Sequence, residues 1–359
     1  MKIRAERDDL ADVLARAARA VTTRSPLPIL QGVLCVVEGG TLTVTGTDLE
    51  VTIRTTLEVE VLEEGRTVIP ARLASEAVRK LPAGAVSIHA REGEVEITGN
   101  GPRFRLRELN IDDFPQISEP DTVGGSSVDG PAFLKALSQV GIAASTDEAR
   151  PILTGVLFEA ESDHLRLVAT DSYRLADRIL PGVITDASGL VPYRALKELS
   201  RAIGDPKLTV RFGDRDAVFS SDRGTLQVRL IEGTFPNVSQ LFPDSYPYQL
   251  KASRAELLEA VGRASLVAED HIPVRFGLHT GGVELSVTRQ EVGDETEHIN
   301  ADYNGDEMTI AFNTKYLSDG LNAIDEDDVV LETADPLKPG LLRGAESEDF
   351  RYLLMPVRL

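Results

Sequence analysis

The sequence predicts an α+β protein of three tandem repeats, in which helices lie on one face of antiparallel sheets. Two observations lead to this fold class. Short stretches of the first third of the chain recur in the second third at nearly constant spacing, and each repeat contains both helical and strand-like hydrophobic patterns. A chain of 359 residues with 42% hydrophobic residues can bury a separate core in each repeat of about 120 residues.

The repeats are marked by four landmarks that keep their order between the first and second copies. Their spacing stays between 121 and 123 residues, and chance matches would not keep four motifs in register. The landmark pairs are 28–34 with 151–157, 42–48 with 165–171, 68–72 with 190–194, and 114–115 with 235–236.

A fainter third copy follows. Residues 284–288 resemble the strand-like stretch at 42–48, and residues 312–317 resemble the start of the second helix of the earlier repeats. Clusters of turn-forming residues near 119–121 and 243–247 mark the joints. We therefore expect three domains, which cover residues 1–120, 121–246 and 247–359.

The elements of each repeat follow one order. In the first repeat an amphipathic helix is predicted from Asp8 to Val21, because Leu10, Leu14 and their apolar neighbours recur at helical spacing. Strands with alternating polarity flank a turn at Gly39-Gly40. A second helix is expected to start near Ala71, Tyr193 and Thr314, and further strands close each unit. Such units place helices on one face of an antiparallel sheet.

No catalytic constellation is visible in the sequence. The five histidines are scattered, and neither a nucleophile-elbow nor a phosphate-loop motif occurs. The single cysteine, Cys35, excludes an internal disulfide and a cysteine-based zinc cluster. Asp48 and Asp171 occupy equivalent repeat positions, which favours a turn or cap role over a paired-carboxylate site. We therefore expect no catalytic residues, metal or cofactor, and an enzyme with a site assembled across repeats remains the alternative.

The sequence also bears on the compartment. No apolar run approaches the roughly 18 residues needed to span a bilayer. The first seven residues, from Met1 to Arg7, form no apolar signal segment. We expect a protein of the reducing cytoplasm without membrane partners.

The net charge of −20 is spread unevenly along the chain. Residues 247–359 hold 22 of the 58 acidic residues but only 10 of the 38 basic ones. The second helix of the middle repeat instead carries Arg194, Lys197 and Arg201 along one face, opposite an apolar face. Such a stripe is commonly only a solvated face. If the repeats surround a common hole, these helices would line it and hold a polyanion by sequence-independent phosphate contacts.

Four stretches carry a resemblance that covers the whole chain. They are 24–30 (RSPLPIL), 169–176 (ATDSYRLA), 233–236 (GTFP) and 352–359 (YLLMPVRL). Through them the chain resembles the bacterial DNA polymerase III beta subunit family, the replicative sliding clamps. The terminal Met-Pro-x-Arg-Leu is the most specific of these motifs.

The resemblance implies three DNA-clamp-like domains per chain, with two helices per domain inside and antiparallel sheets outside. It also implies a homodimer that closes head to tail into a ring. The ring would encircle double-stranded DNA without reading its sequence, and it would tether the replicative DNA polymerase, the clamp loader and other proteins with clamp-binding motifs. Its location would be cytoplasmic and nucleoid-associated. A repeat scaffold that recruits partners without encircling DNA is the alternative binding function.

The family's partner-peptide pocket lies on the second domain and at its junction with the third. Its aliphatic members would form an apolar depression for a Leu or Phe of a short peptide, and Arg174 and Asn313 would hydrogen-bond that peptide. The alternative assigns these residues to the cores of the two domains. The matching positions are Leu153, Thr170, Ser172, Tyr173, Arg174, Leu175, Pro236, Leu241, Asn313, Tyr316, Leu337, Leu353, Leu354, Met355, Pro356, Val357 and Arg358.

The resemblance also implies DNA and dimer contacts. At the ring joint, Phe104 matches a family aromatic residue, and Leu266 with Val267 match the apolar pair opposite it. The chain departs from the common family pattern at Gln240, Ser172 and His271, which affects the expected peptide preference. The expected DNA contacts are Arg24, Arg72, Arg79 and Arg150 from the resemblance, with Lys80, Arg194, Lys197 and Arg201 added from the basic helices.

Overall fold

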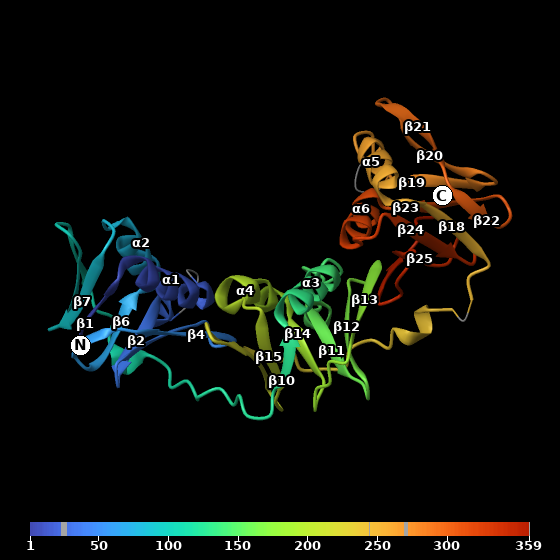
Figure 1. The fold of residues 1–359 in the computed structure, drawn as a ribbon. Helices are drawn as coiled ribbons and strands as arrows, with labels where there is room; N and C mark the ends of the chain where they lie inside the picture. The colour runs from blue at the N-terminus through green and yellow to red at the C-terminus, as the bar shows by residue number, and fades with distance from the viewer. Residues whose placement is uncertain (23–26, 244, 269–271, 359) are drawn as a thin grey trace. The chain divides into compact units, whose positions relative to one another are not determined.

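The structure is a computed structural model that describes residues 1–22, 27–243, 245–268 and 272–358 (Figure 1). Arg24, His271 and Leu359 therefore lie outside the described residues. The chain divides into two compact units. One contains Met1–Leu134 with Thr185–Leu230, and the other contains Lys135–Ile184 with Ile231–Leu359, so the middle repeat contributes to both.

Within the described residues, each repeat contains two α-helices, as the sequence predicts. The first helices are α1 (Arg7–Ala17), α3 (Gly130–Gly141) and α5 (Arg254–Ala264). The second helices begin at the predicted residues and form α2 (Ala71–Lys80), α4 (Tyr193–Ile203) and α6 (Thr314–Ala323).

Helix α1 ends earlier than the predicted Val21. After Ala17 the chain tightens into the 3₁₀ turn η1 (Ala18–Ala20), and Val21 is extended. This end packs closely on a strand, since a Cβ at Gly46 would lie 2.1 Å from the carbonyl oxygen of Ala17. The prediction was too long because apolar residues keep their helical spacing as far as Val21, whereas packing against the strand ends the α-helix at Ala17.

The second helices form because their apolar residues recur on one face. In α4 the buried positions include Ala195, Leu199 and Ala202, while Lys197 and Arg201 are exposed. Helix α2 repeats this division, with Ala74 and Val78 buried and its basic residues exposed. The apolar stripes therefore fix these helices on their sheets and leave their cations in solvent.

In the first unit, antiparallel strands form two sheets. One has the order β5-β1-β7-β8-β9, and the other β10-β15-β16-β17-β4-β3-β2-β6. Gly39 and Gly40, both at positive φ, form the predicted turn between β2 and β3. The bounds are β1 (Lys2–Glu6), β2 (Gly32–Glu38), β3 (Thr41–Thr47), β4 (Val51–Glu58), β5 (Glu60–Glu63), β6 (Gly65–Pro70), β7 (Ala85–Arg91), β8 (Glu94–Thr98), β9 (Arg103–Arg107), β10 (Ser126–Asp129), β15 (Lys207–Phe212), β16 (Asp216–Ser221) and β17 (Gly224–Arg229), with β14 (Gly189–Pro192) before α4.

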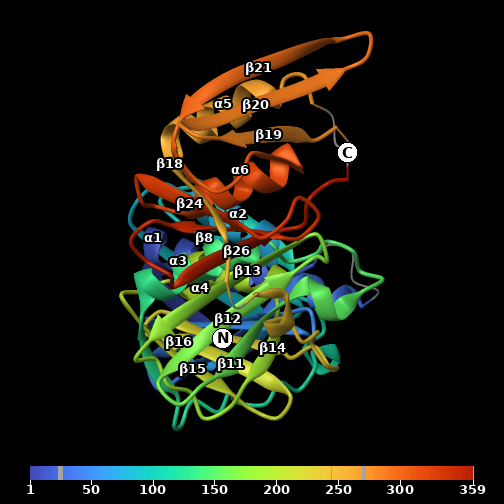
Figure 2. The same ribbon diagram turned by 90° about the vertical axis from the view of Figure 1, so that its right-hand side faces the viewer.

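The second unit is built in the same way. Its strands run in the orders β11-β12-β13-β26-β25-β24-β18-β22 and β21-β20-β19-β23, and β20 with β21 forms a long hairpin (Figure 2). The bounds are β11 (Gly155–Ala160), β12 (His164–Thr170), β13 (Arg174–Pro181), β18 (Tyr248–Ser253), β19 (Val274–His279), β20 (Gly282–Arg289), β21 (Gly293–Asn300), β22 (Asp302–Asn304), β23 (Met308–Phe312), β24 (Asp328–Thr333), β25 (Gly340–Gly344) and β26 (Phe350–Leu354).

Two strand pairs join neighbouring repeats. In the first unit β4 pairs antiparallel with β17, so that Thr52 stands opposite Gln227. In the second unit β13 pairs antiparallel with β26, so that Leu175 stands opposite Leu353. Each sheet therefore continues from one repeat into the next.

The core of the first repeat lies between its helices and sheets. Leu10 and Leu14 of α1 pack in one cluster with Val44, Ile69 and Val78, and all five are nearly inaccessible to solvent. No described helix has the length and apolar character needed to cross a membrane.

Candidate functional site

The predicted pocket residues begin on the sharp turn between β12 and β13. The carboxylate of Asp171 accepts hydrogen bonds from the backbone N–H groups of Tyr173 at 2.9 Å and Arg174 at 3.0 Å. The Thr170 hydroxyl donates to the Arg174 carbonyl at 2.7 Å and accepts from the N–H of Ser172 at 3.2 Å. This confirms the turn role predicted for Asp171. The turn holds Ser172 at a φ of 82° and leaves the Tyr173 side chain 60% exposed.

Arg174 lies buried beneath this turn. Its guanidinium donates to Asp171 at 3.0 Å, to Asp319 of α6 at 2.5 Å and to the Tyr352 hydroxyl at 3.3 Å. It also lies over the Tyr316 ring, 4.4 Å from the centroid. Arg174 therefore connects β13 to α6 and β26 rather than extending into solvent.

Burial and charge act in opposite directions on these groups. Burial by itself lowers the pKa of the Arg174 guanidinium. Tyr352, Asp319 and Asp171 raise that pKa by more than burial lowers it, so the pKa lies above its ordinary value. Burial also raises the pKa of the Tyr352 phenol, so that Tyr352 stays neutral and donates to the Tyr316 carbonyl at 3.0 Å. The result is a fixed cation balanced by carboxylates.

Helix α6 packs closely against β26. Gly320 allows the close approach, because a Cβ there would lie 2.4 Å from the Tyr352 ring. Asn313 caps the helix, and its side-chain oxygen accepts from the N–H of Tyr316 at 3.0 Å. The Tyr316 ring stacks on the Tyr173 ring at a centroid distance of 6.4 Å. Asn313, Tyr316 and Tyr173 are thus brought together from separate repeats.

The aliphatic residues of the predicted pocket fall into two groups. Leu153, Leu175, Leu353 and Leu354 are buried, and Leu175 with Leu353 belongs to one apolar cluster beside Phe235 and Phe242. The exposed group consists of Leu241, Leu337 and Met355, with exposed fractions of 42%, 66% and 43%. The side chains of this second group are available to a ligand, whereas those of the first group lie in the core.

The C-terminal segment leaves the sheet after Leu354 and stays attached to it. The N–H of Met355 donates to the Tyr173 carbonyl at 2.9 Å, and the N–H of Val357 donates to the Ala311 carbonyl at 2.8 Å. Pro356 and Val357 are half-buried, and Arg358 is exposed. Pro236 precedes Val238, which packs in the same apolar cluster as Leu175.

Two residues of this site escaped the sequence reasoning, Asp319 and Tyr352. Tyr352 stands in the C-terminal motif but carries no signal of its contact with Arg174. Asp319 is visible only as a partner four residues after Lys315 on a helix, and that ion pair is 3.2 Å long. The described residues contain no group of three His, Cys, Asp or Glu side chains arranged to hold a metal ion.

The basic residues predicted to contact DNA differ in their surroundings. Arg194 of α4 donates to Asp48 at 3.0 Å and forms a second, short ion pair with Glu50. Lys197 and Arg201, on the same helix, are exposed, and the Lys197 ammonium lies 5.1 Å from the Tyr193 ring centroid. The charge of Arg194 is therefore balanced within the chain.

The remaining predicted DNA contacts lie in both units. In α2, Arg79 and Lys80 are exposed, and Arg72 donates to Glu76 at 3.0 Å. In the second unit, Arg150 donates to Asp147 at 2.8 Å and to the Ser172 hydroxyl at 3.2 Å. Arg150 therefore touches the turn that carries Tyr173.

The three residues predicted at the dimer joint lie on an edge strand and just after a helix. Phe104 is half-buried on β9, which forms one edge of its sheet. Leu266 follows α5 and is 83% exposed, and Val267 beside it is half-buried. An edge strand and an exposed leucine are features that a protein interface covers.

Comparisons with known proteins agree with this architecture. Sequence models of the DNA polymerase III beta subunit match the chain in three parts: the N-terminal domain at residues 1–118, the central domain at 127–237 and the C-terminal domain at 239–358. The beta sliding clamp of Streptomyces coelicolor is 35% identical, with 100% of each chain covered. A beta sliding clamp homolog of Streptomyces muensis, GriR, is 32% identical, with 100% of this chain and 99% of that one covered.

Solved structures give the same result. The sliding clamp of Bacillus subtilis superposes with a TM-score of 0.96 at 27% identity, with 100% of this chain and 99% of that one covered. The DNA polymerase III subunit beta of Pseudomonas aeruginosa gives a TM-score of 0.95 at 28% identity, with both chains fully covered. These matches define a chain of three tandem clamp domains. The chain belongs to the DNA polymerase III beta subunit family, the beta sliding clamps, and is a non-catalytic processivity subunit.

We predict that Arg174→Ala destabilises the fold by about 3 kcal/mol, because it leaves Asp171 and Asp319 without their shared cation. Urea unfolding of the full chain measures this loss. Arg150→Ala, an exposed arginine beside the same turn, is the matched control and should change stability by less than about 1 kcal/mol. Equal losses for the two variants would contradict a structural role for Arg174.

Proposed function

We propose that two copies of this chain close head to tail into a ring that encircles double-stranded DNA. The proposal rests chiefly on the full-length match to solved sliding clamps in all three domains. The half-buried Phe104 on the edge strand β9 would meet Leu266 and Val267 of the other copy. The domain joints would fall near residues 120 and 246, and the ring would work in the cytoplasm, associated with the nucleoid.

The ring would hold DNA through phosphate contacts that carry no sequence information. Support comes from exposed cations on two equivalent helices, with Arg79 and Lys80 on α2 and Lys197 and Arg201 on α4. We expect a smaller part for Arg194, since Asp48 and Glu50 already balance its charge. Such a ring would slide, because every phosphate offers an equivalent contact.

The same chain would tether the replicative polymerase and the clamp loader through a short peptide. In this proposal the apolar side chains of the peptide contact Tyr173, Leu241, Leu337 and Met355 above the buried leucines. Exposed methionine adapts to ligands of different shapes. A tethered polymerase that dissociates stays at high effective concentration near its template, which is the physical basis of processivity.

The ring makes a prediction about topology. The protein should migrate as a dimer of twice 38.9 kDa and, once loaded, should remain on nicked circular DNA. Linearising that DNA should release it, since a ring can slide off an end. Gel filtration of the retained fraction before and after linearisation measures this. A monomeric protein, or equal retention on linear DNA, would contradict encirclement.

The basic face of α4 makes a prediction about salt. Arg201→Glu should weaken binding to a short DNA duplex and lower the slope of log affinity against log salt by about 1, as expected for the loss of one phosphate contact. Fluorescence anisotropy across a salt series measures the slope. Lys207→Glu removes an exposed cation from β15 and serves as the control, with its slope expected to stay near that of the parent protein.

The tail makes a prediction about partners. Deletion of residues 355–359 should weaken binding of a Gln-Leu-x-Leu-Phe-like peptide more than tenfold, because it removes the exposed Met355 and the segment attached to Tyr173. Isothermal titration measures the affinity. The deletion begins after β26, so the dimer and its thermal unfolding should persist as the control. Normal peptide binding by the truncated protein would exclude the tail from the pocket.

A further inference from the structure

The first repeat contains a second copy of the turn that carries the proposed peptide pocket. The Asp48 carboxylate accepts from the N–H of Glu50 at 3.0 Å and of Val51 at 2.7 Å. The Thr47 hydroxyl donates to the Val51 carbonyl at 3.0 Å and accepts from the N–H of Leu49 at 3.0 Å. The counterparts 123 residues later make the same bonds: Thr170, Asp171, Ser172, Tyr173 and Arg174.

The backbone conformation is duplicated as well. Leu49 has a φ of 78° and Ser172, its counterpart, a φ of 82°. The left-handed region is costly for a leucine, by roughly 1 kcal/mol or more, and such residues gather at functional sites. The first repeat therefore keeps this turn although leucine does not favour it.

The partner strand is duplicated too. The N–H of Arg229, at the end of β17, donates to the Glu50 carbonyl at 2.8 Å. In the second unit the N–H of Met355, just after β26, donates to the Tyr173 carbonyl at 2.9 Å. Arg229 thus occupies the position in the first unit that Met355 occupies in the second.

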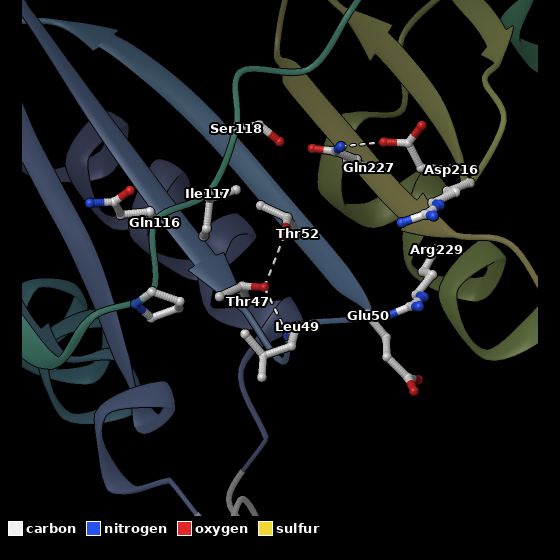
Figure 3. Close-up of a pocket in the computed structure, with 12 residues that line it drawn as sticks. Thr47, Leu49, Glu50, Thr52, Gln116, Ile117, Ser118, Asp216, Gln227 and Arg229 are labelled. Carbon is white, nitrogen blue, oxygen red and sulfur yellow. Dashed lines mark hydrogen bonds between the residues drawn. The ribbon is translucent and has the colours of Figure 1, made fainter.

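A hollow of about 360 Å³ opens at this turn in the first unit, within the size range of ligand sites (Figure 3). Residues 115–118 form one of its walls, and they correspond to residues 236–239 beside the proposed peptide pocket. Thr47, Leu49 and Thr52 form another wall. Asp216 of β16, Gln227 and Arg229 of β17, and Arg215 just before β16 complete the lining. The same frame thus recurs at both joints between repeats, and at the first joint it encloses this hollow.

The lining of this hollow is different in chemistry. Where the second unit has the apolar residues Leu175, Leu353 and Met355, the first unit has Thr52, Gln227 and Arg229. The floor is therefore polar, with the Thr47 and Thr52 hydroxyls 2.9 Å apart (Figure 3). An apolar peptide anchor would lose its favourable burial here.

The charges of the hollow favour an anion. Glu50 is paired with Arg194, whereas Asp216 accepts a hydrogen bond from the neutral Gln227 amide and keeps its charge. Two arginines, Arg215 and Arg229, therefore line the hollow against one carboxylate whose charge is not balanced by Arg194. The exposed Arg215 guanidinium makes no hydrogen bond or ion pair with any residue that the structure describes. Together with Arg229 it can bind a carboxylate in a charge-assisted, two-point contact.

We propose that this hollow is a second docking site, which takes a short acidic peptide of a partner protein. An Asp or Glu of that peptide binds between Arg215 and Arg229, and a neighbouring aliphatic side chain packs beside Leu49 and Ile117. The site goes beyond the proposed function and rests on it only through the correspondence of the two turns. A ring with both sites would engage two kinds of partner segment at once.

The test uses the full chain and two labelled peptides of equal length, Glu-Asp-Leu-Glu-Asp and its neutral amide counterpart Gln-Asn-Leu-Gln-Asn. At low ionic strength, fluorescence anisotropy should show saturable binding of the acidic peptide only. Arg215→Glu should weaken that binding roughly tenfold, the effect of losing one charge-assisted hydrogen bond. Lys207→Glu makes the same change in net charge outside the hollow and should change the affinity less than about twofold.

The outcomes separate this site from the proposed peptide pocket. Deletion of residues 355–359 should leave acidic-peptide binding unchanged, and Arg215→Glu should leave binding of the Gln-Leu-x-Leu-Phe-like peptide unchanged. Three results would overturn the proposal. They are the absence of saturable binding, equal binding by Arg215→Glu and the parent protein, and displacement of the acidic peptide by the Gln-Leu-x-Leu-Phe-like peptide. Thermal unfolding of Arg215→Glu, an exposed position, establishes that a loss of binding is not a loss of fold.

Discussion

Strand pairing between repeats is the constraint on which the rest of this structure depends. The β4–β17 pair joins the first repeat to the middle one, and the β13–β26 pair joins the middle repeat to the last. Backbone N–H and C=O groups of these strands require partners, and each repeat supplies them to the next. The pairing also sets register, which places Leu175 opposite Leu353 and fixes where the C-terminal segment leaves the sheet. Both turns that form the candidate sites stand at the ends of these pairs.

Charge strengthens the second of these joints. Arg174 connects β13 to α6 through Asp319 and to β26 through Tyr352, and Asp177 of β13 pairs with Arg166 and Arg351. A buried ion pair contributes little net stability compared with an apolar contact, but removing one partner is costly. These networks therefore specify one arrangement of β13, β26 and α6. The arginines of these networks also neutralise buried carboxylates in a chain whose net charge is −20.

Duplication followed by divergence explains why two similar frames differ in lining. The hydrogen bonds of the Asp48 and Asp171 turns depend on backbone geometry, one short carboxylate and one threonine hydroxyl, so they tolerate change in the exposed residues. Three pairs of equivalent residues contribute little to the turn through their side chains: Leu49 with Ser172, Glu50 with Tyr173, and Arg229 with Met355. They were free to acquire an apolar surface in one repeat and a polar, cationic hollow in the other.

The sequence by itself determined the repeats, the two helices of each repeat and the turn role of the equivalent aspartates. These features follow from local spacing: apolar residues three and four apart define the buried face of α2 and α4, and Asp48 bonds groups two and three residues away. Only the tertiary structure decided which leucines of the predicted pocket are buried and which are exposed, and which cations are already paired. Arg194 meets Asp48 across 146 residues, and Arg174 meets Asp319 across 145. Local periodicity cannot encode such contacts, because they exist only once strand pairing has brought separate repeats together.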